Sequence, residues 1–479
     1  MILTKVVGCA ILYAEYLLLQ WEKTMSEKRE HFATRLGFIF MTAGCAFGLG
    51  NVWRFPYVTG ANGGALFVLF YIGCLVLFGL PVLMMELALG RAGQSTYPGA
   101  FEKLQNPQVR FKWKIPAYVF ISGNLILLMF YSVVTGWVLF YTVKFFIRDE
   151  KVWDPELFGR FLASPGEQTL YMAVAVIITA VICIGGVKKV IEKSIKVMMA
   201  GLFLLLGVLV FYAFTMPNAS EGIKFFLAPD FSSVTVQNIP ITLNAALAQA
   251  FFTLSIGIGS VSVCGSYMNK ERSLFQEGLW IILLDTIVAV ASGLIIFPCC
   301  AAFGVSPDAG PELIFVTLTK VFSNMQFPYF WGGLFFIFLF VAALSTLIAV
   351  FENLTAFGMD EFKWSREKSC GIFFVVLLIL SMPCILGFNY WQNFEPFGKG
   401  SNILDLEDFI VSANLLPIGS LYLTLFCMYK AGWGSDNFFA EMNTGKGWKF
   451  PVWMRHYIRI VIPAVVFIVW LAGIVEKFF

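Results

Sequence analysis

The chain has 479 residues, of which 59% are hydrophobic and only 13% are charged, and its formal net charge is +3. Soluble proteins are about 45–50% apolar and about 25% charged, so this composition excludes a water-soluble protein and makes nucleic acid an implausible partner. Runs of about 20 apolar residues recur along the chain, and each can cross a hydrocarbon core of about 30 Å as a helix. These runs lack the alternation of outer-membrane strands, so we predict an all-α integral membrane protein in the lipid bilayer.

The predicted spans are bounded by charged residues or by clusters of Gly and Pro. In chain order they cover residues 36–60, 65–90, 115–146, 168–186, 194–216, 241–267, 277–304, 329–357, 370–388, 403–428 and 456–475. We therefore expect about eleven transmembrane helices in a single membrane domain over residues 25–479.

Residues 1–24 are set apart from this domain as an N-terminal extension. VVGC at 6–9 faintly resembles a lipoprotein cleavage site, but the apolar region before Cys9 is too short for a signal peptide. Met25 opens a charged stretch, so we interpret residues 1–24 as an extra surface segment or as the product of a start codon set too early.

The distribution of basic residues predicts the orientation of the spans. Lys and Arg gather in alternate connecting segments, beginning with the segment that precedes Leu36. Basic residues near span ends favour the cytoplasmic side. We expect a multi-pass protein of the cell inner (plasma) membrane, with its N-terminus in the cytoplasm and its C-terminus outside.

The residue types offer little catalytic chemistry. All ten cysteines fall in or beside apolar stretches, which favours small buried side chains over disulfides. The two histidines, His31 and His456, lie in charged segments next to spans, so a His-based metal or nucleophile site cannot be assembled from them. We predict no catalytic residues and no enzymatic activity.

Two spans carry glycine runs at their middle. The first reads FMTAGCAFGLGNVWRFP at 40–56, and the sixth reads AQAFFTLSIGIGSVSV at 248–263. Glycines that allow close helix packing would explain either run alone. The two spans lie five apart, an odd number, so we predict a five-plus-five inverted repeat over residues 36–216 and 241–428, with residues 456–475 as an extra helix. Paired interruptions of this kind point to a transporter's midplane binding site.

A broken helix has a physical requirement that indicates what it binds. Its freed N–H and C=O groups survive in the membrane only where they line a polar cavity. The positive N-terminal end of a half-helix attracts a carboxylate, and freed carbonyls suit Na⁺ or an ammonium group.

Ionisable residues within spans are costly and are therefore functional candidates. They are Arg54, Glu86, Asp285, Glu352, Asp360 and Asp408. Arg54 and Asp408 fall toward the outer ends of their spans and could close an outer gate. For Glu86 and Glu352 we expect structural carboxylates that accept hydrogen bonds from backbone amides of an unwound segment. Asp285 lies mid-span and needs a cation, which Asn51 and Thr253 could help to hold.

Several motifs together resemble one transporter family. They are KREHFATRLG at 28–37, AGCAFGLGNVWRFPYVTGANGGALFVLFY at 43–71, PVLMMELALGR at 81–91, QAFFTLSIGIG at 249–259 and AALSTLIAVFEN at 342–353. They closely resemble the neurotransmitter:sodium symporter family, in particular its prokaryotic amino-acid transporters. The resemblance implies the leucine-transporter fold, with broken helices 1 and 6, and sodium-coupled symport of an amino acid into the cell by alternating access.

The resemblance also implies two sodium sites. The first would use the carbonyls of Ala46 and Thr253, the side chains of Asn51, Thr253 and Asp285, and the carboxylate of the substrate. The second would use the carbonyls of Gly44, Phe47 and Ala342 and the hydroxyls of Ser345 and Thr346. The shared substrate carboxylate would couple the amino acid to Na⁺.

For the substrate, the resemblance implies a small, largely apolar site. The amides of Leu49 and Gly50 and the hydroxyl of Tyr131 would bind the carboxylate. The ammonium group would meet the carbonyls of Ala46, Phe252 and Thr253 and the hydroxyl of Ser255. Leu127, Ile258 and Val350 would surround the side chain, and Thr346 would border the site. Monoamine carriers of the family have an aspartate where this chain has Gly48, so we expect an amino acid. The apolar surroundings of its side chain favour a hydrophobic L-amino acid, aliphatic or aromatic.

The same resemblance implies two gates. Arg54 and Asp408 would close the outer side, above a lid formed by Tyr131 and Phe252. Arg29 and Asp360 would close the inner side. There, Phe32 replaces the usual tryptophan, and this change is expected to loosen the inner seal.

Three positions concern chloride, which animal relatives require. Tyr71 and Gln249 match chloride-site positions, but Ala289 stands where the family has serine or an acidic residue. Asp285 stands where asparagine is common, and its fixed negative charge could replace the anion. We therefore predict that chloride is not required.

Four other functions are compatible with a polytopic membrane protein. A channel would not need paired broken helices around a closed site, and a membrane enzyme would need a nucleophile or metal ligands. A non-transporting amino-acid sensor is distinguished by an uptake measurement. Proton-coupled carriers and exchangers share the fold, but the Ser345–Thr346 pair favours Na⁺.

Overall fold

The computed structural model describes residues 31–46, 48–231, 238–304 and 313–478. Within these ranges nine helices are long and apolar enough to cross a membrane, and no strand is present. A further pair, residues 35–46 and 50–61, is bent by 51° and makes one broken span. The predicted all-α membrane protein is confirmed.

The first predicted repeat contains five membrane segments and their short connecting helices. Its elements are α2 (Arg35–Ala46), η1 (Gly50–Arg54), α3 (Phe55–Ala61), α4 (Ala65–Cys74), η2 (Leu75–Gly79), α5 (Leu80–Gly93), α6 (Tyr97–Leu104), α7 (Lys114–Phe146), η3 (Glu150–Trp153), α8 (Leu157–Leu162), α9 (Pro165–Ile184), η4 (Val187–Ile191) and α10 (Glu192–Ala213). Helix α11 (Ala219–Leu227) leads toward the second repeat.

The rest of the chain contains the second predicted repeat and the predicted extra helix. Its elements are α12 (Asn238–Leu254), α13 (Ser260–Ser266), α14 (Leu274–Phe303), η6 (Leu313–Thr317), α15 (Leu318–Ser323), α16 (Pro328–Phe362), α17 (Arg366–Leu380), α18 (Met382–Leu386), α19 (Ile403–Asp408), η7 (Phe409–Leu415), α20 (Leu416–Met428), α21 (Ser435–Met442), α22 (Met454–His456), η8 (Tyr457–Val461) and α23 (Ile462–Phe478).

Both predicted breaks are present. In the first span α2 ends at Ala46 and η1 begins at Gly50; in the sixth, α12 ends at Leu254 and α13 begins at Ser260. The second break contains positive φ angles at Ser255, Gly257 and Gly259, of 51°, 98° and 83°. At Gly257 a Cβ atom would lie 2.2 Å from the carbonyl oxygen of Leu416, so this turn requires glycine.

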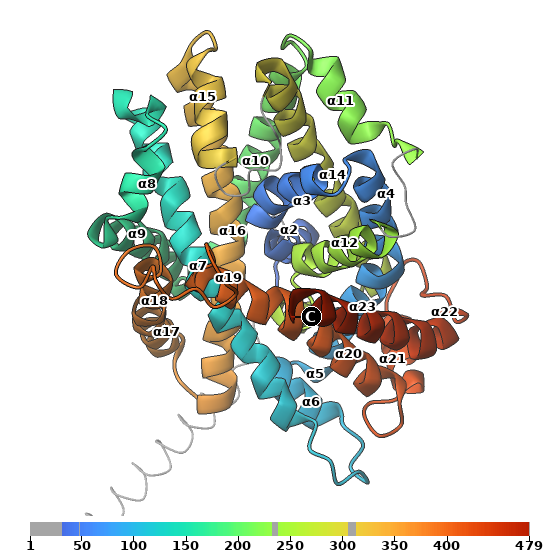
Figure 1. The fold of residues 1–479 in the computed structure, drawn as a ribbon. Coiled ribbons are helices and arrows are strands. Elements are labelled where there is room, and N and C mark those ends of the chain that lie inside the picture. The colour runs from blue at the N-terminus through green and yellow to red at the C-terminus, as the bar shows by residue number, and fades with distance from the viewer. Residues whose placement is uncertain (1–30, 47, 232–237, 305–312, 479) are drawn as a thin grey trace, which may run out of the picture.

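The broken helices lie inside the bundle. Figure 1 shows α2, α3, α12 and α14 near its middle, with α7 and α16 passing beside them. Stacked rings hold α7 and α16 together, with centroids of Tyr141 and Phe336 5.1 Å apart. Close backbone contact holds α5 against α13, because a Cβ at Gly90 would lie 1.8 Å from the carbonyl oxygen of Ser262. The surrounding helices thereby hold the breaks in place.

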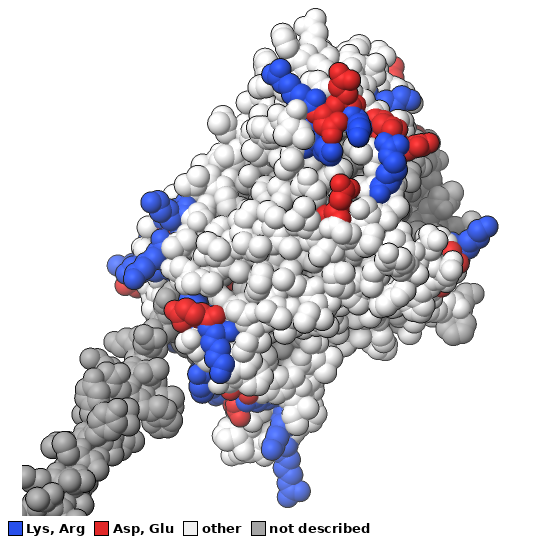
Figure 2. Space-filling model, turned by 90° about the vertical axis from the view of Figure 1, so that its left-hand side faces the viewer, with Lys and Arg blue, Asp and Glu red and all other residues white. Residues whose placement is uncertain are grey.

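The outer surface fits a bilayer. On the face shown in Figure 2, most charged side chains gather near the top and along the lower left, and a broad band between them is uncharged. Apolar side chains on the outer helices are exposed, including Val181 of α9, Phe211 of α10 and Ile468 of α23. In a membrane these side chains contact lipid.

The two structural carboxylates have different partners. The backbone amide of Gly259, in the second break, donates to Glu86 Oε1 at 2.6 Å, as expected for Glu86. The expectation for Glu352 is wrong, because this side chain forms an ion pair with Arg366 at 2.7 Å and accepts a hydrogen bond from the Tyr267 hydroxyl at 2.8 Å. The Arg366 guanidinium, whose side chain is 11% exposed, and a phenol, rather than backbone amides, therefore stabilise its charge.

Candidate transport site

Side chains of the second broken span bind backbone groups freed in the first. The hydroxyl of Ser255 donates to the Cys45 carbonyl at 3.0 Å, and the side-chain amide of Gln249 donates to the Gly50 carbonyl at 3.0 Å. The two breaks therefore face each other and form one polar region inside the bundle.

The residues predicted for the first sodium site lie together. The Thr253 hydroxyl is 2.5 Å from Asn51 Oδ1 and 3.0 Å from Asp285 Oδ1, and Asn51 Nδ2 donates to Asp285 Oδ1 at 2.8 Å. The Tyr71 hydroxyl donates to the other carboxylate oxygen at 3.1 Å. All four side chains are buried. The carbonyl of Ala46, which is also predicted for this site, accepts a hydrogen bond from Gly48 N at 2.8 Å.

A second group of oxygens joins α2 to α16. The Thr346 hydroxyl donates to the Gly44 carbonyl at 2.8 Å, and the Ser345 hydroxyl donates to the Ala342 carbonyl at 2.8 Å. Phe47, also predicted for this site, lies outside the described residues. Both groups contain side-chain oxygen atoms, of Asn51, Thr253 and Asp285 in the first and of Ser345 and Thr346 in the second, and such ligands suit a hard cation. In the described part of the chain, no three His, Cys, Asp or Glu side chains form a metal-binding group.

A small cavity, here called the central cavity, lies between the two breaks. Its volume is about 20 Å³. Its lining residues are Cys45, Ala46, Gly48, Gly50, Leu127, Tyr131, Phe252, Thr253, Ser255, Thr346, Val411 and Leu416. A space of this size holds about one water, so an amino acid enters only when side chains around it move.

Gly48 is confined by its neighbours. A Cβ atom at this position would lie 2.4 Å from the Tyr131 hydroxyl and 2.7 Å from Thr346 Oγ1. The same Tyr131 hydroxyl accepts a hydrogen bond from the backbone amide of Leu49 at 2.9 Å. The absence of a side chain at Gly48 therefore lets Tyr131 reach the broken backbone.

A second cavity, here called the outer cavity, lies on the side predicted to face outside. Its volume is about 210 Å³, and Gly50, Tyr131 and Phe252 line both it and the central cavity. Arg54 and Asp408 both line it, yet no ion pair within 4.0 Å joins them. The Arg54 guanidinium instead lies 4.4 Å above the Phe252 ring and donates to Gln249 Oε1 at 3.3 Å. The predicted gate pair is therefore apart in this structure.

The opposite side is held together by direct contacts. The Phe32 ring packs against Phe38 and Tyr267, with centroids 5.9 Å apart in each pair. Arg35 of α2 forms an ion pair with Glu277 of α14 at 2.9 Å. These contacts fix the end of α2 against its neighbours.

Asp360, predicted as the inner gate acid, is bound by the segment between α5 and α6. It accepts hydrogen bonds from the Thr96 amide at 2.6 Å and the Ser95 hydroxyl at 3.2 Å. Its predicted partner Arg29 lies outside the described residues.

Comparison with known proteins identifies the chain. The model of the sodium:neurotransmitter symporter family matches residues 29–156 and 157–478. The chain belongs to this family. It is therefore a multi-pass membrane transporter and not an enzyme.

Two bacterial relatives of this transporter match along nearly their whole length. YhdH of Bacillus subtilis, described as an uncharacterized sodium-dependent transporter, is 34% identical over 93% of this chain and 98% of its own. An uncharacterized sodium-dependent transporter of Haemophilus influenzae is 31% identical over 94% and 99%. The crystal structure of MhsT in complex with L-phenylalanine superposes with a TM-score of 0.82 at 37% identity, covering 92% of this chain and 99% of that chain.

Most predicted substrate-site residues of the symporter line the central cavity, and three do not. Leu49 lines the outer cavity instead. Ile258 and Val350 are buried, but they are not among the residues that line the central cavity. Cys45, Val411 and Leu416 line it without having been predicted. Cys45 lies beside the first break, and this proximity could have predicted it as a lining residue. Val411 and Leu416 cannot be distinguished by sequence from other apolar residues of a span.

At the positions that correspond to the family's chloride site, the polar side chains are hydrogen-bonded to other groups of the protein. Tyr71 donates to Asp285 and Gln249 donates to the backbone of the first break, while Ala289 is buried on α14, four residues after Asp285. Sequence reasoning assigned Tyr71 only to chloride and missed its bond to Asp285. That contact joins α4 to α14, 214 residues apart, which no local pattern indicates.

Proposed function

We propose that this symporter carries a hydrophobic L-amino acid into the cell together with Na⁺, by alternating access. The observation that carries the proposal is the pair of oxygen groups at the first break, which border a cavity that has no acidic side chain among its lining residues. A substrate that brings its own carboxylate fits such a cavity. The descriptions of YhdH as sodium-dependent and of MhsT as a complex with L-phenylalanine support the same assignment.

The first sodium ion would couple directly to the substrate. Asn51, Asp285, Thr253 and the Ala46 carbonyl would hold it, and the substrate carboxylate would complete the shell. Three neutral donors surround Asp285, and no Lys or Arg lies within 4.0 Å of its carboxylate in the described chain. A monovalent cation at this point neutralises a charge that is otherwise costly in the membrane.

The second sodium ion would tie the broken helix to α16. Gly44, Phe47 and Ala342 would supply carbonyls, and Ser345 and Thr346 would supply hydroxyls. The bond between Thr346 and Gly44 supports this role, since it already connects the two elements that the ion would bridge.

For the substrate, Tyr131 and the amides of Leu49 and Gly50 would bind the carboxylate. The Ser255 hydroxyl and the carbonyls of Ala46, Phe252 and Thr253 would bind the ammonium group. Leu127, Ile258 and Val350, the residues predicted to surround the side chain, are aliphatic, and so are Val411 and Leu416 of the central cavity. This lining favours an apolar side chain.

Transport would follow from differential binding to two states. In the present structure the outer cavity lies above Tyr131 and Phe252. On the other side, Phe32, Arg35 and Glu277 line a separate cavity of about 140 Å³ that shares no lining residue with the central cavity. Binding of Na⁺ and substrate would favour a state in which Arg54 and Asp408 meet. Opening of the other side would then release both into the cytoplasm, where the N-terminus is expected.

Uptake into proteoliposomes tests the proposal. The panel is Leu, Ile, Val, Met, Phe, Tyr, Trp, Ala and Gly, each radiolabelled, with an inward Na⁺ gradient and with K⁺ replacing Na⁺. We expect accumulation of apolar amino acids only with Na⁺. Equal uptake in K⁺ with a proton gradient would identify a proton-coupled carrier instead, and Na⁺-dependent binding without uptake would identify a sensor.

A further inference from the structure

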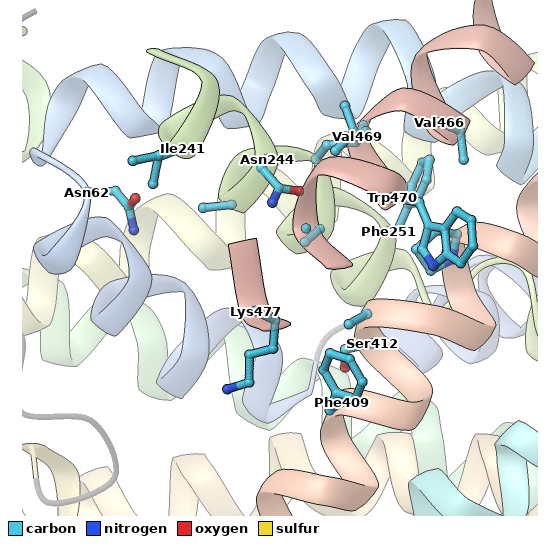
Figure 3. Close-up of a pocket in the computed structure, with 16 residues that line it drawn as sticks. Asn62, Ile241, Asn244, Phe251, Phe409, Ser412, Val466, Val469, Trp470 and Lys477 are labelled. Atoms are coloured by element: carbon cyan, nitrogen blue, oxygen red, sulfur yellow. The ribbon is translucent and has the colours of Figure 1, made fainter. Parts of the chain in front are cut away.

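A third cavity lies between α12, η7 and α23, apart from the two cavities of the transport site. Figure 3 shows its lining side chains. Its volume is about 460 Å³, which is within the range of small-molecule pockets. Most of its lining is apolar and includes Ile241, Ala248, Phe251, Ala413, Pro417 and Val469. We call it the lateral cavity.

The lateral cavity borders the surface that contacts lipid. Ile241 lines it and is 48% exposed, and α23 exposes the apolar side chains of Ile468 and Val475. In a membrane these exposed side chains meet hydrocarbon and not water. A molecule that enters this cavity therefore comes from the bilayer.

Polar groups and one cation border the same cavity. Asn62, Asn244, Ser412 and Lys477 line it, and Figure 3 shows Lys477 extending from the last turns of α23. The Lys477 ammonium lies 4.4 Å above the Phe397 ring, and no carboxylate among the described side chains, which do not include that of Glu476, lies within 4.0 Å of it. Its acidic neighbour Asp405 accepts a hydrogen bond from Asn402 at 2.9 Å.

We propose that the lateral cavity binds an anionic phospholipid of the phosphatidylglycerol type. One acyl chain occupies the apolar part of the cavity, and the phosphate lies at Lys477. A lysine near the end of a span, next to an apolar cavity open to the bilayer, matches a molecule with a negative head group and a hydrocarbon tail. A zwitterionic lipid would fill the same space but would place its own cation near Lys477.

The bound lipid would contact the outer lid from behind. Phe251 lines the lateral cavity, while the next residue, Phe252, lines the central and outer cavities. Ser412 lines the lateral cavity and donates at 2.5 Å to Asp408, which lines the outer cavity. Lipid binding and the position of the lid are therefore thermodynamically linked.

Quenching of tryptophan fluorescence by brominated lipids tests the site. Trp470 lines the lateral cavity, so bromine on a bound acyl chain quenches it on contact. The purified full-length protein is titrated with dibrominated phosphatidylglycerol or phosphatidylcholine. Subtracting the quenching of Trp470→Phe isolates the Trp470 component from the other tryptophans. We expect phosphatidylglycerol to quench this component at about fivefold lower mole fraction, the preference that one lysine gives for an anionic head group.

Three variants separate head-group recognition from general lipid contact. Lys477→Gln should remove the preference, and Ala248→Phe should remove the quenching by filling the cavity. Lys320→Gln, the matched control on α15, should keep both because Lys320 is exposed and does not line the cavity.

Three results would overturn the proposal. Equal quenching by the two lipids would mean annular contact only, and no quenching by either would mean that protein, such as a second copy of the chain, covers the cavity. A preference that survives Lys477→Gln would place the head group elsewhere. None of these readouts depends on Na⁺ or on uptake, so they are independent of the proposed function.

Discussion

The side-chain amide of Asn51 is bonded to Asp285 twice, at 2.8 Å from carboxylate oxygen Oδ1 and 3.0 Å from the main-chain carbonyl. This contact joins η1, directly after the first break, to the middle of α14. Both residues are fully buried. Because a carboxylate in the membrane interior is costly without a cation, the pair marks the place where a bound cation would stabilise the fold most.

Removal of either partner should abolish Na⁺-dependent substrate binding. Asp285→Ala removes the negative charge, and Asn51→Ala removes the amide that orients it. Each hydrogen bond or ion contact to a charged group is worth about 1.5–3 kcal/mol. The loss of one such contact at this site should therefore lower the Na⁺ affinity at least tenfold. Scintillation proximity binding across a Na⁺ titration measures this. Thr286→Ala is the control, because this hydroxyl lies on the same helix and donates to the Ile282 carbonyl, four residues before it, and not to Asp285. Wild-type Na⁺ affinity in both variants would remove this site as assigned.

Transport should not require chloride. Asp285 already supplies a fixed negative charge, and its second oxygen is bonded to Tyr71, a residue at a chloride-site position. Uptake is measured with chloride replaced by gluconate at constant Na⁺, and we expect no change. A severalfold decrease would show that the carboxylate does not replace the anion.

Substitution of Gly48 should impair transport, moderately with alanine and completely with aspartate. Gly48→Ala places a methyl group 2.4 Å from the Tyr131 hydroxyl, so Tyr131 must move and its bond from Leu49 is weakened. Gly48→Asp adds a carboxylate that repels the carboxylate of the substrate. We expect reduced uptake for alanine and none for aspartate. Gly201→Ala, at a site with open space, serves as the control. Unimpaired uptake by Gly48→Asp would contradict the placement of the substrate.

Neutralising Arg54 should impair transport but leave Na⁺-dependent substrate binding intact. Arg54 here covers Phe252 and contacts Gln249, but it must reach Asp408 to close the outer cavity. We expect Arg54→Gln and Asp408→Asn each to lower uptake at least tenfold while Na⁺-dependent binding persists. Parallel binding and uptake assays on the same preparation measure the difference. Uptake at the wild-type rate in both variants would exclude the pair as a gate.

The spans and both breaks were predictable because their signals are local. Hydrophobic length sets a membrane helix, and glycine is favoured where φ is positive, as at Gly257 and Gly259. The oxygen groups around Asn51 and Ser345 followed from family motifs rather than from spacing. The family motifs also gave most of the lining of the central cavity, but not Val411 and Leu416, which differ in no local property from apolar residues that face lipid.

Long-range ion pairs were also missed. Arg35 and Glu277 lie 242 residues apart, and only the packing of α2 against α14 brings them together. Glu352 and Arg366 are closer in sequence, but α16 ends between them, so helical spacing does not predict their contact.

The pair of Glu352 and Arg366 gives a prediction about stability. Glu352 is fully buried, and the guanidinium binds both of its oxygens, at 2.7 and 2.9 Å. Removing one partner of a buried pair leaves an uncompensated charge and costs about 3–5 kcal/mol. Arg366→Gln should therefore lower the thermal unfolding temperature in detergent. Size-exclusion chromatography of heated samples measures this temperature.

Two further variants decide whether the lost stability comes from the unpaired charge. Lys368→Gln, two residues away, is the matched control, because Lys368 is exposed and its ammonium contacts only the face of Trp364. The double variant Glu352→Gln/Arg366→Gln should be more stable than Arg366→Gln alone, since its buried amide carries no charge and can still accept from Tyr267. If the double variant is the less stable of the two, shape and packing hold α16 to α17 at this point, and the ion pair does not.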